Sequence, residues 1–295
     1  MLLLPLPLLP PLQVVLMIRS LVILALGFCL LPTASPAADL FPDKNLEAVV
    51  REQVFEKRNN TMPLVEADVM NIARVVGKGK KIANLSGLEK CRSLAEVDLE
   101  GNEIVDLAPL KDLKSIQSLN LDKNKIASIE PLAGLTEIQY LKIADNQIED
   151  LNPLRKIAAL RNLYAANNKI KDIAPLAECK KVYSLYLNGN PIDNFKPLAE
   201  LKNLERVDLR NTSISDLAPL AGLTELRYTF LNFTKVSDLA VLVEMAKKDF
   251  EGQKRFAPFW HVFLGDTPLS EAAKTTQLAE LKKYGVRVNT ESLKW

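Results

Sequence analysis

A repeat of 22 residues constrains the fold of this chain more than any other feature. From Leu94 to Leu201, apolar residues, one asparagine and one proline return in the order L-x-x-L-x-L-x-x-N-x-I-x-x-L-x-P-L. A fixed period of this length indicates stacked units, each too small to bury a core of its own. The asparagine column consists of Asn102, Asn124, Asn146, Asn168 and Asn190. We therefore expect a one-dimensional array.

The chemistry of one unit predicts its shape. The alternation in Val97-Asp98-Leu99 indicates a short strand with one buried face, and successive units place such strands side by side in a parallel sheet. Each column asparagine is expected to point inward and to bond backbone groups that the turn would leave unpaired. The D-L-x-P-L segment, which leads the chain back to the next strand, is short, and its prolines favour the start of a short helical turn. The aspartates expected to accept backbone N–H groups there are Asp106, Asp150, Asp172 and Asp216.

The predicted fold class is therefore an α/β solenoid. Its parallel sheet is concave, because the strand side of each unit is wider than the return side. Short 3-10 or helical turns lie on the convex side, and the two ends of the core need caps. We expect a helical N-terminal cap at residues 39–71, repeats at 72–245, and a last degenerate repeat with a helical C-terminal cap at 246–295.

The first 38 residues have the pattern of a secretory signal peptide. A positively charged start at Met17-Ile18-Arg19 precedes an apolar run, and small residues follow at Ala34, Ala37 and Ala38. The true start is then Met17 and cleavage falls near Ala37 or Ala38; the alternative is an uncleaved signal anchor. We expect export to the periplasm or the exterior, with no membrane association after cleavage.

Two short sequence segments support a resemblance to a known family. Phe41-Pro42-Asp43-Lys44-Asn45-Leu46 in the cap and Asp106-Leu107-Ala108-Pro109-Leu110 in the repeats are similar to bacterial leucine-rich-repeat proteins of the internalin-like class. The resemblance covers roughly residues 41–295. It implies a curved solenoid that binds a partner, usually a protein, on its concave sheet.

Composition and isolated reactive residues argue against several other functions. The chain has 38 basic and 36 acidic residues, a formal charge of +2, which gives no electrostatic reason to expect nucleic-acid binding. His261 is the one histidine, and no nucleophile elbow or phosphate loop is present in the sequence. We expect no catalysis, no metal and no cofactor.

Cys91 and Cys179 occupy the same column of the repeat. Strand spacing places their Cα atoms roughly 19 Å apart, beyond the ~7 Å limit for a disulfide. Both are expected to be buried apolar residues.

The repeat phase also predicts the binding site. Residues that flank the buried strand positions face outward on the concave sheet, and aromatic and arginine residues gather there toward the centre and C-terminal part. Such residues dominate interface hot spots. Aromatic residues are, however, also common in strands that bind nothing. Two hypotheses stay open: a protein partner, or a glycan stacked on the rings. The predicted ligand-binding residues are Tyr140, Tyr164, Tyr186, Arg206, Arg210, Tyr228 and Phe230.

Overall fold

The computed structural model describes residues 39–291. The predicted signal peptide at residues 1–38 lies outside this range. No helix within the described range is both long and apolar enough to cross a membrane.

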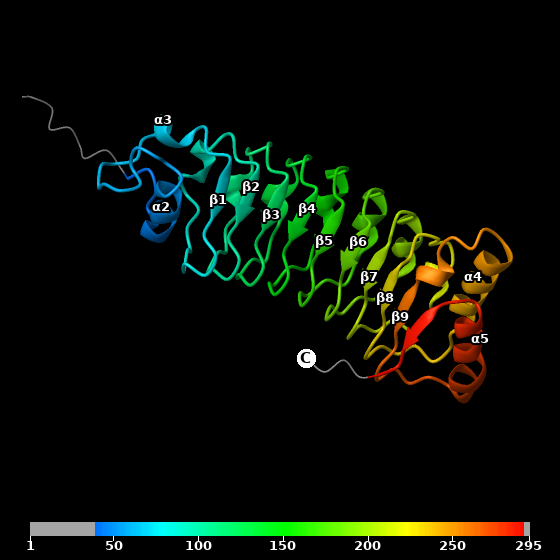
Figure 1. The fold of residues 1–295 in the computed structure, drawn as a ribbon. Helices are drawn as coiled ribbons and strands as arrows, with labels where there is room; N and C mark the ends of the chain where they lie inside the picture. The colour runs from blue at the N-terminus through cyan, green and yellow to red at the C-terminus, as the bar shows by residue number, and fades with distance from the viewer. Residues whose placement is uncertain (1–38, 292–295) are drawn as a thin grey trace, which may run out of the picture. The chain divides into compact units, whose positions relative to one another are not determined.

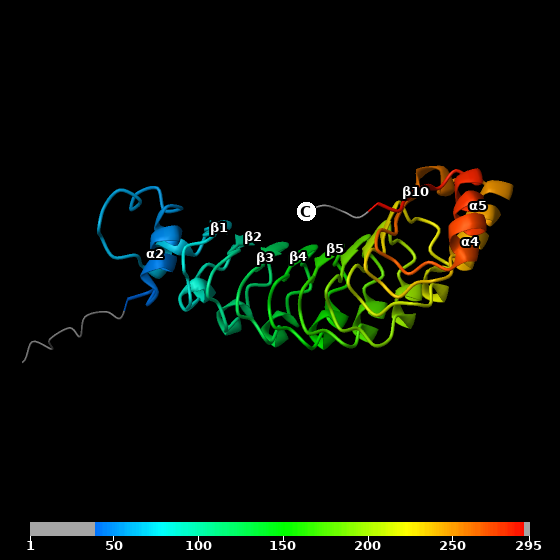
Figure 2. The ribbon, with the colours of Figure 1, turned by 90° about the horizontal axis from the view of Figure 1, so that it is seen from below.

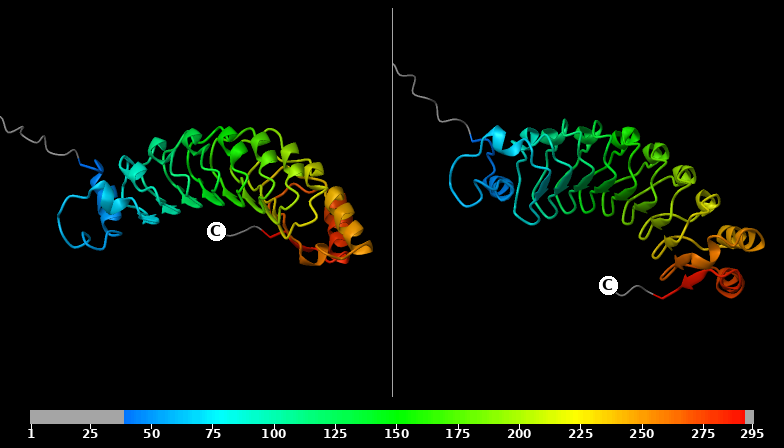
Figure 3. Two further views of the ribbon diagram at one scale, coloured as in Figure 1. Left: turned by 90° about the horizontal axis from the view of Figure 1, so that it is seen from above. Right: turned by 45° about the horizontal axis from the view of Figure 1, so that its top comes forward.

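Ten short strands form one parallel sheet in strict chain order. Residues of neighbouring strands pair at the repeat spacing, for example Val97 with Leu119 and Leu119 with Leu141. Figure 1 shows the strands side by side, and Figure 3 shows them on the inside of a curve with the short helices outside, within residues 40–291. The predicted solenoid with a concave parallel sheet is confirmed. The strands are β1 (Arg74–Val76), β2 (Glu96–Asp98), β3 (Ser118–Asn120), β4 (Tyr140–Lys142), β5 (Asn162–Tyr164), β6 (Ser184–Tyr186), β7 (Arg206–Asp208), β8 (Tyr228–Phe230), β9 (His261–Phe263) and β10 (Arg287–Asn289).

Short 3-10 turns form the convex side, as the compact return segment requires. Proline occupies the first turn of η2 to η7, where its fixed φ suits a helical start. Asp106 accepts the N–H of Ala108 at 2.8 Å, and Asp150, Asp172 and Asp216 repeat this bond at the same distance. The turns are η1 (Leu88–Lys90), η2 (Ala108–Leu110), η3 (Glu130–Leu132), η4 (Asn152–Lys156), η5 (Ala174–Glu178), η6 (Lys196–Glu200) and η7 (Ala218–Leu220).

The asparagine column points inward and joins each coil to the one before it. Asn146 Nδ2 donates to the carbonyls of Ile143 and Ala144 in its own coil, at 3.2 and 3.1 Å, and to Leu121 of the preceding coil at 2.9 Å. Its Oδ1 accepts the N–H of Ile126, also in the preceding coil, at 3.0 Å. Equivalent bonds run through the column, which confirms the predicted role.

The N-terminal cap consists of α2 (Lys44–Arg51), a loop, and α3 (Glu66–Val69). The carboxylate of Asp43 caps α2 by accepting the N–H groups of Asn45 and Leu46 at 2.9 and 3.1 Å. It also accepts the N–H groups of Ala83 and Asn84 at 2.8 and 3.0 Å. One side chain therefore caps the helix and ties it to the first coil.

The C-terminal end combines α4 (Ala240–Glu251), η8 (Ala257–Phe259), η9 (Ala273–Gln277) and α5 (Leu278–Lys283). Figure 2 shows α4 and α5 together at this end of the array. Trp260 is fully buried and donates from Nε1 to Thr229 Oγ1 at 2.9 Å. Helix α4 begins before residue 246, so the predicted start of the C-terminal region falls inside this helix.

Candidate binding face

Three columns of side chains form the concave face, because alternate residues of each short strand point away from the core. The first column contains Glu96, Ser118, Tyr140, Asn162, Ser184, Arg206, Tyr228 and His261. The middle column contains Asp98, Asn120, Lys142, Tyr164, Tyr186, Asp208, Phe230 and Phe263. The third column follows each strand two residues further on and contains Glu100, Asp122, Ala144, Ala166, Asn188, Arg210 and Asn232.

Three tyrosines make a ladder across β4, β5 and β6. The rings of Tyr164 and Tyr186 lie nearly parallel at 14° with their centroids 4.5 Å apart, and Tyr140 is tilted against Tyr164 at 5.3 Å. The Lys142 ammonium lies 5.7 and 5.4 Å from the centroids of Tyr140 and Tyr164. Burial raises the pKa of Tyr164 to about 12. We call these rings the tyrosine ladder.

A second group, the aromatic cluster, covers β8 and β9. Tyr228 stacks on His261 at 5.1 Å, and Phe230 stacks on Phe263 at 4.6 Å. His261 and Phe263 were not among the predicted site residues. The sequence did carry a signal for them, because Val262 and Leu264 restate the buried positions of the repeat.

Two arginines connect and cover these groups. Arg206 Nη1 donates to the Tyr186 hydroxyl at 3.3 Å, while its guanidinium lies 4.6 Å from the Tyr228 ring centroid. Arg206 therefore joins the tyrosine ladder to the aromatic cluster. The Arg210 guanidinium lies 5.4 Å from the Phe230 centroid. All seven predicted binding residues thus lie on one face, along one continuous strip.

Four residues expected to face outward are instead buried: Asn120, Ser184, Asp208 and Asn232. Asp208 is 0% exposed because the larger side chains of the neighbouring coils and Arg210 cover it. It accepts from Arg210 Nε at 2.8 and 3.0 Å, so it fixes the arginine in place. Asn232 is also 0% exposed, beside Gly265 and the backbone of Glu291. The expectation that every flanking residue is exposed is wrong at these four positions.

The opposite end of the face is acidic. Glu100 pairs with Lys78 at 2.8 Å and with Lys123 at 3.2 Å, and the hydrogen bond from Lys78 is the main cause of its lowered pKa. Burial raises the pKa of Asp122 to about 6, against the hydrogen bond of 2.6 Å that it accepts from the Ala144 N–H. The character of the face therefore changes along the array: carboxylates lie near β2 and β3, and cationic and aromatic side chains lie from β4 onward.

The potential metal ligands of the described range are dispersed, and its two cysteines are buried. Residues 39–291 contain no group of three or more His, Cys, Asp or Glu side chains placed to hold a metal ion. Cys91 and Cys179 are buried and unpaired. Burial raises their thiol pKa values to about 12 and about 11, which suppresses the reactive thiolate form.

Comparison with known proteins agrees with this architecture. A family model described as leucine-rich repeats, in two copies, matches residues 114–156 and 159–200. The crystal structure of internalin C2 from Listeria monocytogenes is 32% identical, with a TM-score of 0.67, and the match covers 70% of this chain and 91% of that one. No curated protein matches the chain.

Two further structures from Listeria monocytogenes share the fold. Internalin InlF is 24% identical with a TM-score of 0.55, over 86% of this chain and 90% of that one. The functional domain of InlJ is 19% identical with a TM-score of 0.60, over 83% of this chain and 54% of that one. The period, the parallel sheet and the similarity to internalin C2 together place this chain in the internalin-like class of leucine-rich-repeat proteins.

Proposed function

We propose that this chain is an exported, non-catalytic scaffold that binds a partner protein on its concave face. The observation that carries the proposal is the continuous strip formed by the tyrosine ladder, Arg206 and the aromatic cluster. Its rings are partly exposed on an open sheet, where they fill no core. An exposed apolar strip of this kind is typical of an interaction surface.

The strip is held in place before any partner arrives. Tyr164 and Tyr186 support each other by stacking, and Asp208 fixes Arg210 over Phe230. Side chains that are already ordered lose less conformational entropy on binding. The proposed anchors are Tyr164, Tyr186, Tyr228 and Phe230, and Arg206 with Arg210 orients an acidic or carbonyl-rich segment of the partner.

The arrangement of the rings favours a protein over a glycan. A sugar binds an aromatic platform through an open ring face, but Tyr164 faces Tyr186 at 4.5 Å and Phe230 faces Phe263 at 4.6 Å. These faces are occupied by neighbouring rings, while Arg206 covers Tyr228 at 4.6 Å. The outward groups are ring edges, phenol hydroxyls and guanidinium N–H groups, which suit the backbone and side chains of a protein.

Export is supported by the sequence of residues 1–38, with its charged start, apolar run and small residues before Asp39. The proposed location is the periplasm or the exterior. Removal of the segment would leave a chain that begins at the N-terminal cap. N-terminal sequencing of the protein recovered from each cell fraction tests this part of the proposal: a chain beginning near Ala38 or Asp39 is expected, and an intact N-terminus in a membrane fraction contradicts it.

The binding proposal is tested with a Tyr164→Ser, Tyr186→Ser double variant. Proteins captured by the wild-type protein are identified by mass spectrometry, and the affinity of the tightest is measured for both proteins. We expect at least a ~30-fold loss, because even a single hot-spot residue contributes roughly 2 kcal/mol or more. The matched control is Lys171→Ser, Lys181→Ser, which removes two exposed residues outside the concave columns. A folded tyrosine variant with wild-type affinity would show that the strip is not the binding site.

A further inference from the structure

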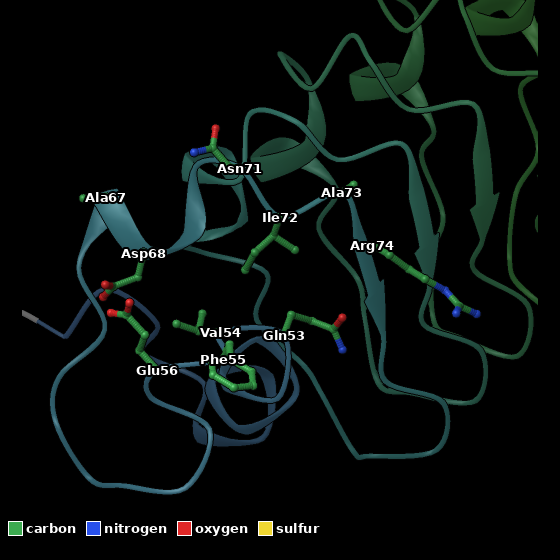
Figure 4. A pocket seen from close by; sticks show the side chains of 10 residues that line it. All are labelled: Gln53, Val54, Phe55, Glu56, Ala67, Asp68, Asn71, Ile72, Ala73 and Arg74. Carbon is green, nitrogen blue, oxygen red and sulfur yellow. The ribbon is translucent and has the colours of Figure 1, made fainter.

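Within residues 39–291, the first strand of the sheet has no strand on its outer edge, and a hollow in the N-terminal cap lies beside it. The hollow, of about 530 Å³, lies between the turn that follows α2 and the segment that leads from α3 into β1. Figure 4 shows Val54, Phe55 and Ile72 at its centre, the carboxylates of Glu56 and Asp68 together at one side, and Arg74 at the other. None of these residues belongs to the concave strip.

The edge of β1 follows from the hydrogen bonds of the sheet. Glu96 N–H donates to Ala73 O at 3.1 Å, and Gly77 N–H donates to Asp98 O at 2.8 Å, so the odd-numbered residues of this segment bond to β2. Alternate residues of a strand direct their N–H and C=O groups to opposite edges. Arg74 and Val76 therefore direct these groups away from β2. Within residues 39–291 none of the four main-chain groups of Arg74 and Val76 has a hydrogen-bond partner.

The neighbouring loop presents apolar side chains on a fixed backbone. Phe55 is 76% exposed, Met62 54% and Val65 50%. Arg51 Nη1 donates to the Met62 carbonyl at 2.8 Å, and Lys57 Nζ donates to the Pro63 carbonyl at 2.7 Å. Two basic side chains thus hold the loop backbone, and Leu64 of the loop is buried in the core, although Phe55, Met62 and Val65 are not.

The charges around the hollow indicate which side chains would fit. Lys57 neutralises Asp68 at 2.6 Å, and Arg74 is paired with Glu96 at 3.1 Å. Glu56, which lines the same hollow as Asp68, has no hydrogen bond or ion pair from its carboxylate within the described range. The Arg58 guanidinium already lies 4.5 Å from the Phe55 ring centroid, and Glu56 is the carboxylate left to pair with a basic side chain of the partner.

We propose that the free edge of β1 is a second docking site, which takes an extended segment of a partner protein. The segment pairs its backbone with Arg74 and Val76, places an apolar side chain against Val54, Phe55 and Ile72, and places a basic side chain at Glu56. Strand addition of this kind obtains its affinity from main-chain hydrogen bonds and its specificity from pockets for alternate side chains. It also uses a sheet edge that a protein otherwise has to protect.

A phage-displayed library of random dodecapeptides, selected against the purified protein, provides the probe. We expect enrichment of peptides that alternate apolar residues and carry a basic residue. The most enriched peptide, synthesised and added in excess, should slow hydrogen exchange of the Arg74 and Val76 amides at least tenfold. No enriched sequence, or unchanged exchange at both amides, would overturn the proposal.

A pair of variants separates the backbone of Arg74 from its side chain. Arg74→Pro removes the edge N–H, and proline is tolerated on the free side of an edge strand, so the variant should lose at least tenfold in peptide affinity. Arg74→Ala keeps that N–H and should bind within about twofold of wild type. Equal binding by both variants contradicts strand addition. If Arg74→Pro does not fold, the same selected peptide with N-methylated alternate amides replaces it, and undiminished binding of that peptide contradicts the proposal.

A second copy of this chain is the competing occupant. At the other end of the sheet, Arg287 N–H donates to Trp260 O at 2.9 Å and Asn289 O accepts from Leu264 N–H at 2.8 Å. Only Val288 of β10 therefore directs its main-chain groups away from β9, so β10 of a second copy offers a shorter edge than an extended peptide does. Sedimentation velocity measures this alternative directly. Self-association that Arg74→Pro abolishes would assign the edge to a second copy and overturn the peptide proposal. The outcome is independent of the Tyr164→Ser, Tyr186→Ser variant, because those two residues lie on β5 and β6 and Arg74 lies on β1.

Discussion

A single asparagine per coil satisfies backbone groups of two coils. Asn146 makes four hydrogen bonds to main-chain atoms that are otherwise enclosed. Asn146→Ala should lower the free energy of unfolding by about 1–3 kcal/mol or more, because an unpaired buried group costs that amount. Asn59→Ala, at an exposed asparagine, is the matched control and should leave stability unchanged. Chemical denaturation measures both, and equal midpoints would contradict the inward role of the column.

Threonine in the same column leaves part of this network unused. Thr212 donates one bond, from Oγ1 to the Leu209 carbonyl at 2.6 Å. An asparagine there could also reach the Leu187 carbonyl and the Ile192 N–H, by analogy with the bonds of Asn190. We expect Thr212→Asn to be neutral or to stabilise the protein by about 1 kcal/mol. A marked loss of stability in thermal unfolding would show that this coil turns differently.

Asp122 gives the array a pH-dependent residue at its acidic end. Burial raises its folded pKa to about 6, above the usual value of 3.8, and Glu100 and Asp145 act in the same direction while Lys142 opposes them. The folded state therefore binds the proton more tightly, so this residue's contribution to stability falls as pH rises from about 4 to about 6. Asp122→Asn should raise the melting temperature at pH 7 and leave it nearly unchanged at pH 4. If the Asp122→Asn variant melts at the wild-type temperature at both pH values, the prediction is wrong.

At the scale of elements, the period predicted most of what the structure contains. Strands, 3-10 turns and the asparagine column follow from 22-residue spacing, because each coil repeats one local solution. The position of His261 was harder to recognise: it pairs with Tyr228, 33 residues earlier, because α4 lies between the two strands. The burial of Asp208 could not be predicted from its own coil, since Arg210 and side chains of adjacent coils cover it.

The N-terminal cap depends on one carboxylate. Asp43 accepts two N–H groups from α2 and two from the first coil. Asp43→Ala should increase hydrogen exchange in α2 and in the coil around Ala83, because contacts in a solenoid are local. Exchange in the coils from β6 to β8 should stay unchanged and serves as the internal control. Uniformly faster exchange along the whole array would show that the cap is coupled globally.

At the scale of the whole molecule, charge is distributed unevenly along the concave face. Glu96 and Asp98 lie at one end, and Arg206 with the aromatic cluster lies toward the other. A partner that binds the tyrosine ladder is then oriented by this charge gradient, with its acidic or carbonyl-rich segment at Arg206. Opposite charges placed along an interface set orientation and association rate more than they set total affinity.

Charge reversal at the two ends tests this orientation. Arg206→Glu removes the bond to Tyr186 and the cation over Tyr228, and it places a carboxylate where the proposed partner is acidic. Repulsion should slow association, and loss of the guanidinium contacts should speed dissociation. We expect at least a ~10-fold loss of affinity for the captured partner, with a larger effect at low salt because screening weakens it as ionic strength rises. Glu96→Lys, at the far end of the same column, should change affinity less than about threefold. If Glu96→Lys costs as much as Arg206→Glu, the partner covers the whole face and the proposed orientation is wrong.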